Sequence, residues 1–512
     1  MTESTKLHHS AERAAAPRRS STALRITWVL EVLLAALCIP ALWMDALVLP
    51  ILCATLLLVE QLRSALQHGL IWQRSFVFCF SLGNLGCMVY ANAAYVLLTT
   101  LPQYGDHTLS MWFTIGHVFA AMVGCRLVEL VLPRTPHPIP VYGQQDVSSW
   151  QALAITGFIY AALTVLTFFV AGDTRWNPEE ASSATVFAQG IGRIADLFFF
   201  VLGYRLQPNF LKPRNLGLLL LAGVLALTNG LVRGYREPVV ISLLTFTVGA
   251  LVRAQALPVL RRQLVVAGLI ALPVFALYWQ AVGSARDEFA DKGIVERIVL
   301  TLTEVDRNKG AEADDANENM VARLFEPSGQ DVIARLANTD GHDAGFEHFE
   351  RLIYLLVPRF LAPEKQTAGV GPEILARDFH YYNIDELTHI PITLVADCYR
   401  RGGLLWVLAV GFFTGIVLRL EYLLTRKLAK GPMFDAIIAA TAVRYIRLYP
   451  YSVPALITFV SWYWLKDVFM FASIGVLILA SQSFMRRRSK ASQPGSASST
   501  GRRLTATQAK PS

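Results

Sequence analysis

Apolar segments of about twenty residues recur along almost the whole of this chain, and a helix needs about 20 apolar residues to cross the hydrocarbon core of a bilayer. We therefore predict about twelve membrane-spanning helices. The predicted spans are 26–44, 46–62, 75–99, 110–132, 150–171, 185–206, 214–232, 238–253, 262–282, 390–422, 433–452 and 462–484. The first span is too long for the apolar core of a signal peptide and a second follows at once, so we interpret it as an uncleaved anchor.

Composition agrees with an all-α polytopic membrane protein. Of the 512 residues, 54% are hydrophobic and 16% are charged, whereas soluble domains carry about 25% charged residues. The six cysteines lie in or beside apolar runs or at a predicted membrane boundary. We therefore expect buried thiols rather than a disulfide framework.

Basic residues predict the topology. The joins after even-numbered spans carry Arg63, Arg74, Arg134, Arg205, Lys212, Arg214, Arg253, Arg261, Arg262, Arg426, Lys427 and Lys430. The joins after odd-numbered spans are acidic or neutral, such as "TTLPQYGDHTLS". Because basic residues favour the cytoplasmic side, both termini are predicted to face the cytoplasm, which requires an even number of spans.

Five regions follow from this topology: a basic tail (1–22), spans 1 to 9 (23–282), a large extracytoplasmic loop (283–388), spans 10 to 12 (389–485) and a second basic tail (486–512). The loop holds 21 Asp and Glu against 11 Arg and Lys, a net charge of −10, while the remainder carries +18. The overall charge of +8 therefore reflects cytoplasmic anchoring and not nucleic-acid binding.

The two halves of the loop differ. The first contains "EADDANEN", which is typical of a solvated segment, although its carboxylates could hold a divalent cation. The second contains "FEHFERLIYLL", where apolar residues recur at helical spacing. We predict an amphipathic helix there, ending at Pro358.

Ionisable residues also occur inside predicted spans. Arg126 with Glu129, and Arg193 with Asp196, stand three residues apart, so each pair can neutralise itself on one helix face. Intramembrane charges can also line a proton or ion path, which leaves a transporter as an alternative.

A second group of charges falls on the predicted outer side. "LVRGYREPVV" holds Arg233, Arg236 and Glu237 in a short outer join, where basic residues are the exception. These arginines either extend along the membrane surface or form an anion site. Pro238 suits the first turn of the next helix, whose N–H groups would then point at the same place.

Further charged residues follow on the same predicted side. They are Arg359, Lys365, Arg377, His380, His389, Asp397, Arg400, Arg401, Arg444 and Arg447. Asp397 and its two arginines belong with the others if "ITLVADCYRR" is a short segment that reaches only partway into the membrane. Arginine binds phosphate through a planar, bidentate fork. We expect these cations to converge from separated segments.

This layout resembles the Wzy-type O-antigen and exopolysaccharide repeat-unit polymerases, mainly over 230–425. The pair Arg233 and Arg236 precedes the large loop, as in that family. "YLLVPRFLAPEKQ" is similar to the family's "PRF–W-P-K-P" stretch, with Ala362 where an aromatic residue is common. "HIPITLVADCYRRGGLLWVLAVGFFTGIV" resembles the segment in which an acidic residue and a glycine pair lead into the next span.

The resemblance implies a membrane glycosyltransferase of the GT-C type in the bacterial inner membrane. It would polymerise undecaprenyl-pyrophosphate-linked repeat units at the periplasmic face, without metal or cofactor. The implied partners are lipid-linked oligosaccharide, membrane lipids, a chain-length regulator and a flippase.

The resemblance also suggests site roles. We expect pyrophosphate to bind Arg233 and Arg236 in one patch and Arg359, Lys365, Arg400 and Arg401 in another, with Arg444 and Arg447 nearby. The candidate general bases are His389, Glu237 and Asp397, which spacing does not separate. The structured half of the loop is expected to cover the site, with His380, Tyr381 and Tyr382 against sugar.

Two alternatives stay open. An O-antigen ligase would transfer finished glycan to lipid A core, using Arg377 with His380 or Arg359 with His389. A lipid-linked oligosaccharide flippase or other transporter would need no catalytic groups. The long one-sided loop and the lack of convincing inverted repeats disfavour the transporter.

Overall fold

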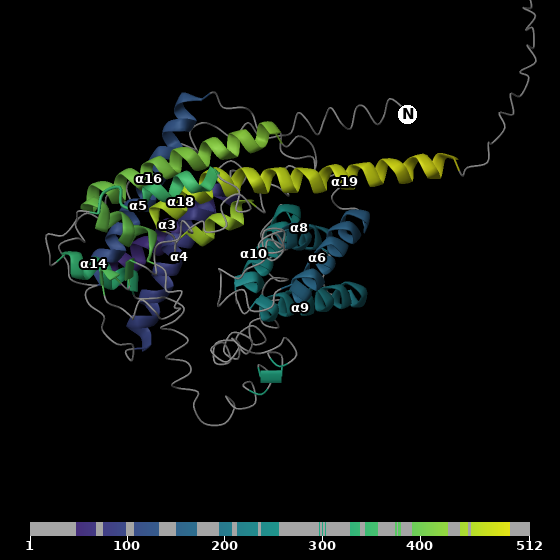
Figure 1. Cartoon of the computed structure of the whole chain (residues 1–512), viewed down its shortest axis with the longest axis horizontal. Helices are drawn as coiled ribbons and strands as arrows, with labels where there is room; N and C mark the ends of the chain where they lie inside the picture. The colour runs from purple at the N-terminus through teal and green to yellow at the C-terminus, as the bar shows by residue number, and fades with distance from the viewer. Residues whose placement is uncertain are drawn as a thin grey trace, which may run out of the picture.

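The computed structural model describes residues 48–67, 75–98, 107–132, 150–170, 194–206, 212–233, 237–254, 328–337, 344–356, 392–428, 441–448 and 452–491, together with 296, 299–300, 303, 374–375 and 377–379. Within these ranges all regular structure is helical and there is no strand (Figure 1).

Most of the described helices overlap predicted spans, although the described end of the span predicted over 433–452 is a 3-10 helix. Seven precede the loop: α3 (Val48–Gln67), α4 (Ser75–Leu98), α5 (His107–Val131), α6 (Trp150–Val170), α8 (Ile194–Leu206), α9 (Pro213–Arg233) and α10 (Glu237–Ala254). The loop contributes α14 (Ser328–Ala337) and the 3-10 helix η2 (Phe349–Leu356). After the loop come α16 (Leu394–Leu428), the 3-10 helix η3 (Tyr445–Leu448), α18 (Val453–Thr458), the π-helical η4 (Phe459–Tyr463) and α19 (Trp464–Ala491). The predicted spans 26–44 and 262–282 lie outside the described residues.

Two of the described helices are long and apolar enough to cross a membrane. They are His107–Val131 and the stretch Leu394–Thr425 of α16. Shorter apolar helical stretches occur in five further places, including Trp150–Val165 and Val239–Ala250. The described part of the chain is thus helical. Two of its helices have the length and composition expected of membrane-spanning helices.

These two helices, α5 and α16, pack backbone against backbone through glycines. Gly411 and Gly415 form the small-residue pair of "GFFTG" in α16, and a Cβ on Gly415 would overlap the carbonyl oxygen of Ala121. Gly124 of α5 lies equally close to the carbonyl of Phe412. Small residues four positions apart let two helices approach closely where burial of apolar surface supplies no driving force.

The contacts along this interface show that α5 and α16 run in the same direction. Phe113 meets Tyr399 near the start of both helices, with ring centroids 4.7 Å apart. Near their ends, Arg126 pairs with Glu129 at 2.8 Å, which confirms the predicted i,i+3 pair, and Arg419 of α16 approaches Glu129 at 4.0 Å. A parallel arrangement is what the predicted topology requires of spans 4 and 10.

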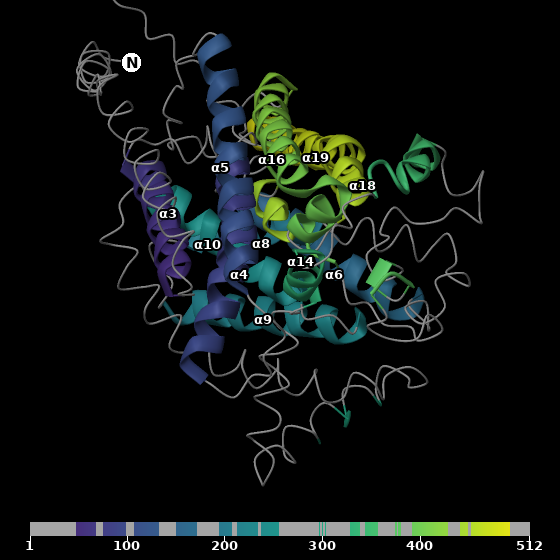
Figure 2. The same cartoon turned by 90° about the vertical axis from the view of Figure 1, so that its left-hand side faces the viewer.

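Helices α6, α8, α9 and α10 pack together beside this pair (Figure 2). Gly203 of α8 meets the backbone of Phe246, and Gly249 of α10 meets the backbone of Phe200. The hydroxyl of Tyr160 in α6 donates to the carbonyl of Leu225 in α9 at 3.3 Å. The long helix α19 contacts α6 and α8 and continues from η4, so it joins the two groups of helices (Figure 1).

A sharp break divides α16 at Gly402 and Gly403. Gly403 has φ 65° and ψ −152°, a conformation that is open essentially only to glycine. A Cβ on Gly402 would overlap the indole of Trp406. The break leaves a short helix over 394–401 ahead of the long apolar helix, so the single span predicted over 390–422 consists of two helical segments.

Candidate functional site

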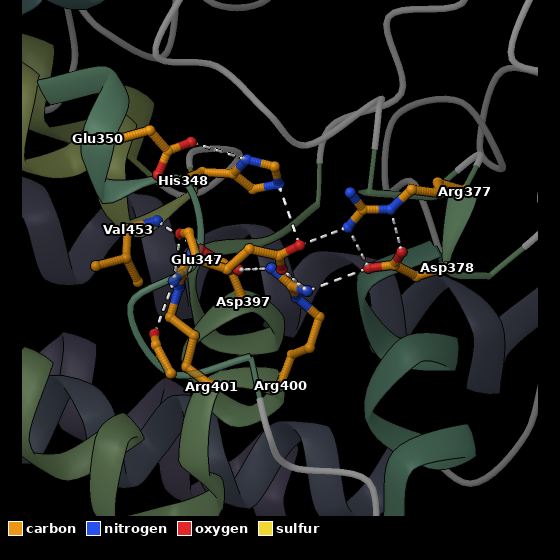
Figure 3. A network of polar contacts seen from close by, with 10 residues as sticks. Glu347, His348, Glu350, Arg377, Asp378, Asp397, Arg400, Arg401 and Val453 are labelled. Carbon is orange, nitrogen blue, oxygen red and sulfur yellow. Dashed lines mark hydrogen bonds and ion pairs between the residues drawn. The ribbon is translucent and has the colours of Figure 1, made fainter.

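The densest group of charged side chains in the described residues lies where the loop meets the short half of α16. We call it the Asp397 cluster: Glu347, His348, Arg377, Asp378, Asp397, Arg400 and Arg401 (Figure 3). Its members come from three stretches of sequence, 347–348, 377–378 and 397–401.

Asp397 lies at the centre of the cluster and is fully buried. Arg401 Nε donates to its Oδ2 at 3.0 Å, and Arg400 Nη2 lies 3.4 Å from Oδ1. The backbone N–H of Val453, the first residue of α18, also donates to Oδ2 at 2.8 Å. The carboxylate therefore ties α16 to α18. It was a candidate base in the sequence, but its protein partners give it a positioning role instead.

Arg401 docks the loop onto α16. Its Nη1 donates to the carbonyls of Gly345 and Glu347 at 2.8 and 2.9 Å, and its guanidinium lies over the ring of Phe349. The Gly345 N–H donates back to the Arg401 carbonyl at 3.1 Å. The Arg401 side chain has 0% exposure, so we correct the prediction that it binds pyrophosphate. Its guanidinium instead holds the loop against α16 through the Gly345 and Glu347 carbonyls.

Arg400 and Arg377 share two carboxylates on the loop side of the cluster. Arg400 Nη1 donates to Glu347 Oε2 at 2.7 Å and to Asp378 Oδ2 at 3.1 Å. Arg377 donates to the other oxygen of each carboxylate, at 2.7 and 2.6 Å. Arg400 is buried, whereas the Arg377 side chain is 43% exposed. Arg377 therefore forms the solvent-facing edge of the cluster.

These contacts change the acidity of the loop residues. Burial raises the pKa of Glu347, but the hydrogen bonds from Arg400 and Arg377 outweigh it and lower the pKa to about 2. The pKa of Arg377 is raised, chiefly by its hydrogen bonds to Asp378 and Glu347. Three guanidinium groups thus face three carboxylates, which leaves the cluster balanced in charge.

His348 is the unusual residue of the cluster. Its φ of 63° is the only positive φ among the described non-glycine residues. The ring is buried, with Nε2 3.6 Å from Glu347 and Nδ1 3.7 Å from Glu350. Nε2 has no hydrogen-bond partner. Residues in sparsely populated backbone conformations occur often at functional sites.

The sequence analysis missed Glu347, His348 and Asp378. In "FEHFERLIYLL" the apolar residues predict the helix, and the polar residues between them look like its solvated face. Glu347 contacts Arg400 and Arg401, more than 50 residues away, and Asp378 contacts Arg400, 22 residues away. The available signal was the placement of an acid and a histidine at the start of that amphipathic segment.

A second polar contact lies farther along α16. Tyr445 of η3 donates its hydroxyl to Glu421, and Trp464 Nε1 donates to Thr425 at 3.0 Å. At about 1.5 Å per residue, Glu421 lies about 27 Å from the break in α16. Arg444, which directly precedes Tyr445, is 1% exposed. Arg444 was expected beside the outer cations, so we correct its position: its segment packs in the interior, against Glu421 and Phe76.

Several predicted site residues have a described backbone only. Arg233 ends α9, Glu237 begins α10 and Arg447 lies in η3. The remaining predicted residues lie outside the described part: Arg236, Arg359, Lys365, His380, Tyr381, Tyr382 and His389.

Within the described ranges, no group of three or more His, Cys, Asp or Glu residues could hold a metal ion. Comparisons of the chain with protein-family models, with curated proteins and with solved structures find no match.

Proposed function

We propose that this protein is a membrane-embedded glycosyltransferase. It polymerises undecaprenyl-pyrophosphate-linked repeat units at the periplasmic face of a bacterial inner membrane, with about twelve spans and both termini in the cytoplasm. The observation that carries the proposal is the convergence of Arg377, from the loop, with Arg400, from the short half of broken helix α16. Cationic groups from distant segments meet there beside a structured loop.

Paired arginines suit this reaction because negative charge grows on the pyrophosphate as the anomeric C–O bond breaks. Preorganised donors aimed at that charge are a large source of rate enhancement. Glu347 and Asp378 hold the two guanidinium groups in place without substrate. A pyrophosphate offers more negative charge and more acceptor oxygens, so it competes for the same N–H groups. Arg233 and Arg236 remain the predicted second patch, and Arg359 and Lys365 remain predicted partners of Arg400 in the first.

The bases predicted from the sequence are His389, Glu237 and Asp397; the oxygens of Asp397 are held by Arg400, Arg401 and the Val453 N–H, so His389 and Glu237 fit this proposal best. The base would accept the proton of the acceptor hydroxyl as that oxygen attacks the anomeric carbon. The bond to the pyrophosphate breaks, and the lipid pyrophosphate leaves with the electron pair.

Deletion of the gene tests the class of reaction. Loss of a polymerase leaves single repeat units on the carrier, so short products are the expected result. Long polymer stranded on the carrier would instead identify a ligase. An unchanged glycan profile would contradict both activities.

Complementation then tests the residues. Arg377→Ala should restore no polymer although the protein accumulates normally, because a half-exposed side chain contributes little to folding. Lys427→Gln is the matched control: it removes an exposed cation from the far end of α16 and should restore full polymer. Normal polymer from Arg377→Ala would remove Arg377 from the site.

A further inference from the structure

An exposed aromatic side chain lies at the point where the loop meets α16. Phe346 is 72% exposed, although hydrogen bonds hold the backbone around it. The neighbouring Gly345 N–H donates to the Arg401 carbonyl at 3.1 Å, and the Phe349 N–H donates to the Phe346 carbonyl at 3.1 Å. Gly345, with φ 42°, and His348, with φ 63°, form the tight turn around Phe346. The turn therefore presents the ring outward as a fixed feature of the fold.

The Phe346 ring belongs to a larger apolar surface. Its centroid lies 5.3 Å from that of Trp406 and 5.2 Å from that of Phe349. Trp406 lies in the first turn of the long half of α16, where Leu404 is 50% exposed and Leu405 is 75% exposed. A single exposed apolar residue is ordinary at a protein surface, whereas a contiguous apolar patch rimmed by polar residues marks an interaction site.

Charged residues border this apolar group on the side of the loop. The side chain of Glu350 is 64% exposed and that of Glu347 is 32% exposed. Both follow Phe346 within four residues, so one short turn carries an apolar tip and a charged edge. A segment at a membrane surface has this division, with its apolar side toward the acyl chains and its charged side toward water.

The apolar surface continues along α16. This helix is long and apolar enough to cross a membrane, and 33% of the residues in its most apolar part are buried, against 61% in α5. Its glycine face packs on α5 through Gly411 and Gly415. The large apolar side chains left exposed along the rest of the helix are Leu404, Leu405, Leu408, Phe413, Leu420 and Leu424. In a helix that crosses a bilayer, an uncovered apolar face of this length contacts acyl chains.

We infer that the turn at 344–349 inserts Phe346 into the outer leaflet of the membrane, and that the lipid surface is the partner of this apolar group. Tryptophan is enriched at membrane–water interfaces, and Trp406 lies beside Phe346 where the long apolar half of α16 begins. Continuity with the exposed face of α16 favours the leaflet over a second protein. The leaflet thereby holds the loop at the membrane surface, with the Asp397 cluster at the level of the lipid headgroups. This contact with lipid is independent of the reaction proposed above.

The test measures the depth of position 346 in vesicles of phosphatidylethanolamine and phosphatidylglycerol that contain no polyprenyl lipid. Phe346→Cys is made in the full-length chain after its six native cysteines are replaced by alanine, and it is labelled with a nitrobenzoxadiazole dye. Leu405→Cys is the control on α16, and Glu350→Cys is the control on the charged side of the same turn. The dye is quenched either by a phospholipid with a nitroxide on its acyl chain or by iodide added to both sides of the bilayer.

The nitroxide lipid should quench the dye at position 346 as strongly as at position 405. Iodide quenching at position 346 should be no more than about half of that at position 350, as for a side chain about 5–10 Å below the headgroup boundary. Equal iodide quenching at positions 346 and 350 would overturn the insertion. Protection from both quenchers would show that protein covers the ring, and would also overturn it. The reading at position 405 verifies that the cysteine-free chain is folded in the bilayer.

Discussion

The two polar regions of α16 differ in how their buried polar side chains are paired. At the short half of the helix, Asp397 and its two arginines are compensated by opposite charges from the loop. Farther along, Glu421 accepts a hydrogen bond from Tyr445 in a setting of aromatic rings that includes Phe76, Tyr422 and Phe459. The first region has a solvent-facing edge at Arg377, whereas Glu421 and Tyr445 are both buried.

This difference indicates different purposes. The balanced ion pairs fix a loop to a helix, and Arg377 among them reaches solvent. The interior pair, Tyr445 and Glu421, joins η3 to α16 and is buried. Chemistry is therefore expected at the Asp397 cluster, and packing specificity at Glu421 and Tyr445.

The largest effect is expected from Asp397→Asn. The change leaves two buried guanidinium groups without their central counter-charge, and breaking a buried pair costs about 3–5 kcal/mol. Unfolding of the purified protein in detergent measures the loss. Glu350→Gln is the control, since its side chain is 64% exposed and should change stability little. Equal stability of the two variants would contradict the central role of Asp397.

The second-largest effect is expected from Gly415→Ala, a substitution that pushes α5 and α16 apart. Gly415 lies between the two polar regions of α16. The added methyl group overlaps the Ala121 backbone, and overpacking of this kind costs about 1–3 kcal/mol. Gly217→Ala in α9 meets open space and should stabilise its helix by about 0.5–1 kcal/mol. Unfolding midpoints that move in opposite directions are the expected outcome; a matching fall in both would show that the close approach is unimportant.

Tyr445→Phe removes the hydroxyl that donates to Glu421. We expect a loss of about 1.5 kcal/mol, since a buried carboxylate then loses a hydrogen bond. The loss should be independent of salt, because the pair is buried and salt screens buried groups weakly. Measurement of the unfolding midpoint at low and high salt checks both points. A loss that disappeared at high salt would place the pair at the surface.

The smallest effect is the acid response of the loop. Folding lowers the pKa of Glu347 to about 2 from an ordinary value near 4.5, so its contribution to stability is complete above about pH 4.5. The contribution is lost as the pH falls from there to about 2. Hydrogen exchange of the Gly345 amide, corrected for its intrinsic rate, should show loop opening in that window. Glu347→Gln should remove this part of the pH dependence, and an unchanged profile would contradict it.

Sequence patterns predicted most of the helices, because each helix contains a long apolar run. Such runs are required for burial in a membrane or in a protein core. The directions of α5 and α16 also follow from the basic residues near their ends. The break in α16 was not predicted: the sequence indicated one span over 390–422, and the short segment at "ITLVADCYRR" was only a condition for placing Asp397 with the outer cations.

The site was harder to predict. Asp397 looks like a base in the sequence, since nothing there shows that Arg401 and the Val453 N–H occupy its oxygens. Glu347 and Arg377 pair across 30 residues of the loop, a separation that spacing does not reveal. Arg444 was misplaced because spacing alone did not show that η3 packs beside Glu421. Long-range pairing of charges leaves no periodic signal in a sequence.

The most direct measurement is the rate of glycan transfer by purified protein supplied with a polyprenyl-pyrophosphate-linked repeat unit. We expect polymer with the wild type and with Lys427→Gln, and a rate lowered about 100-fold or more by Arg377→Ala, as for loss of a group that stabilises developing charge. Arg377→Lys should rescue poorly, because a single ammonium cannot replace a bidentate fork. Transfer at the wild-type rate by Arg377→Ala would show that Arg377 does not stabilise the leaving pyrophosphate.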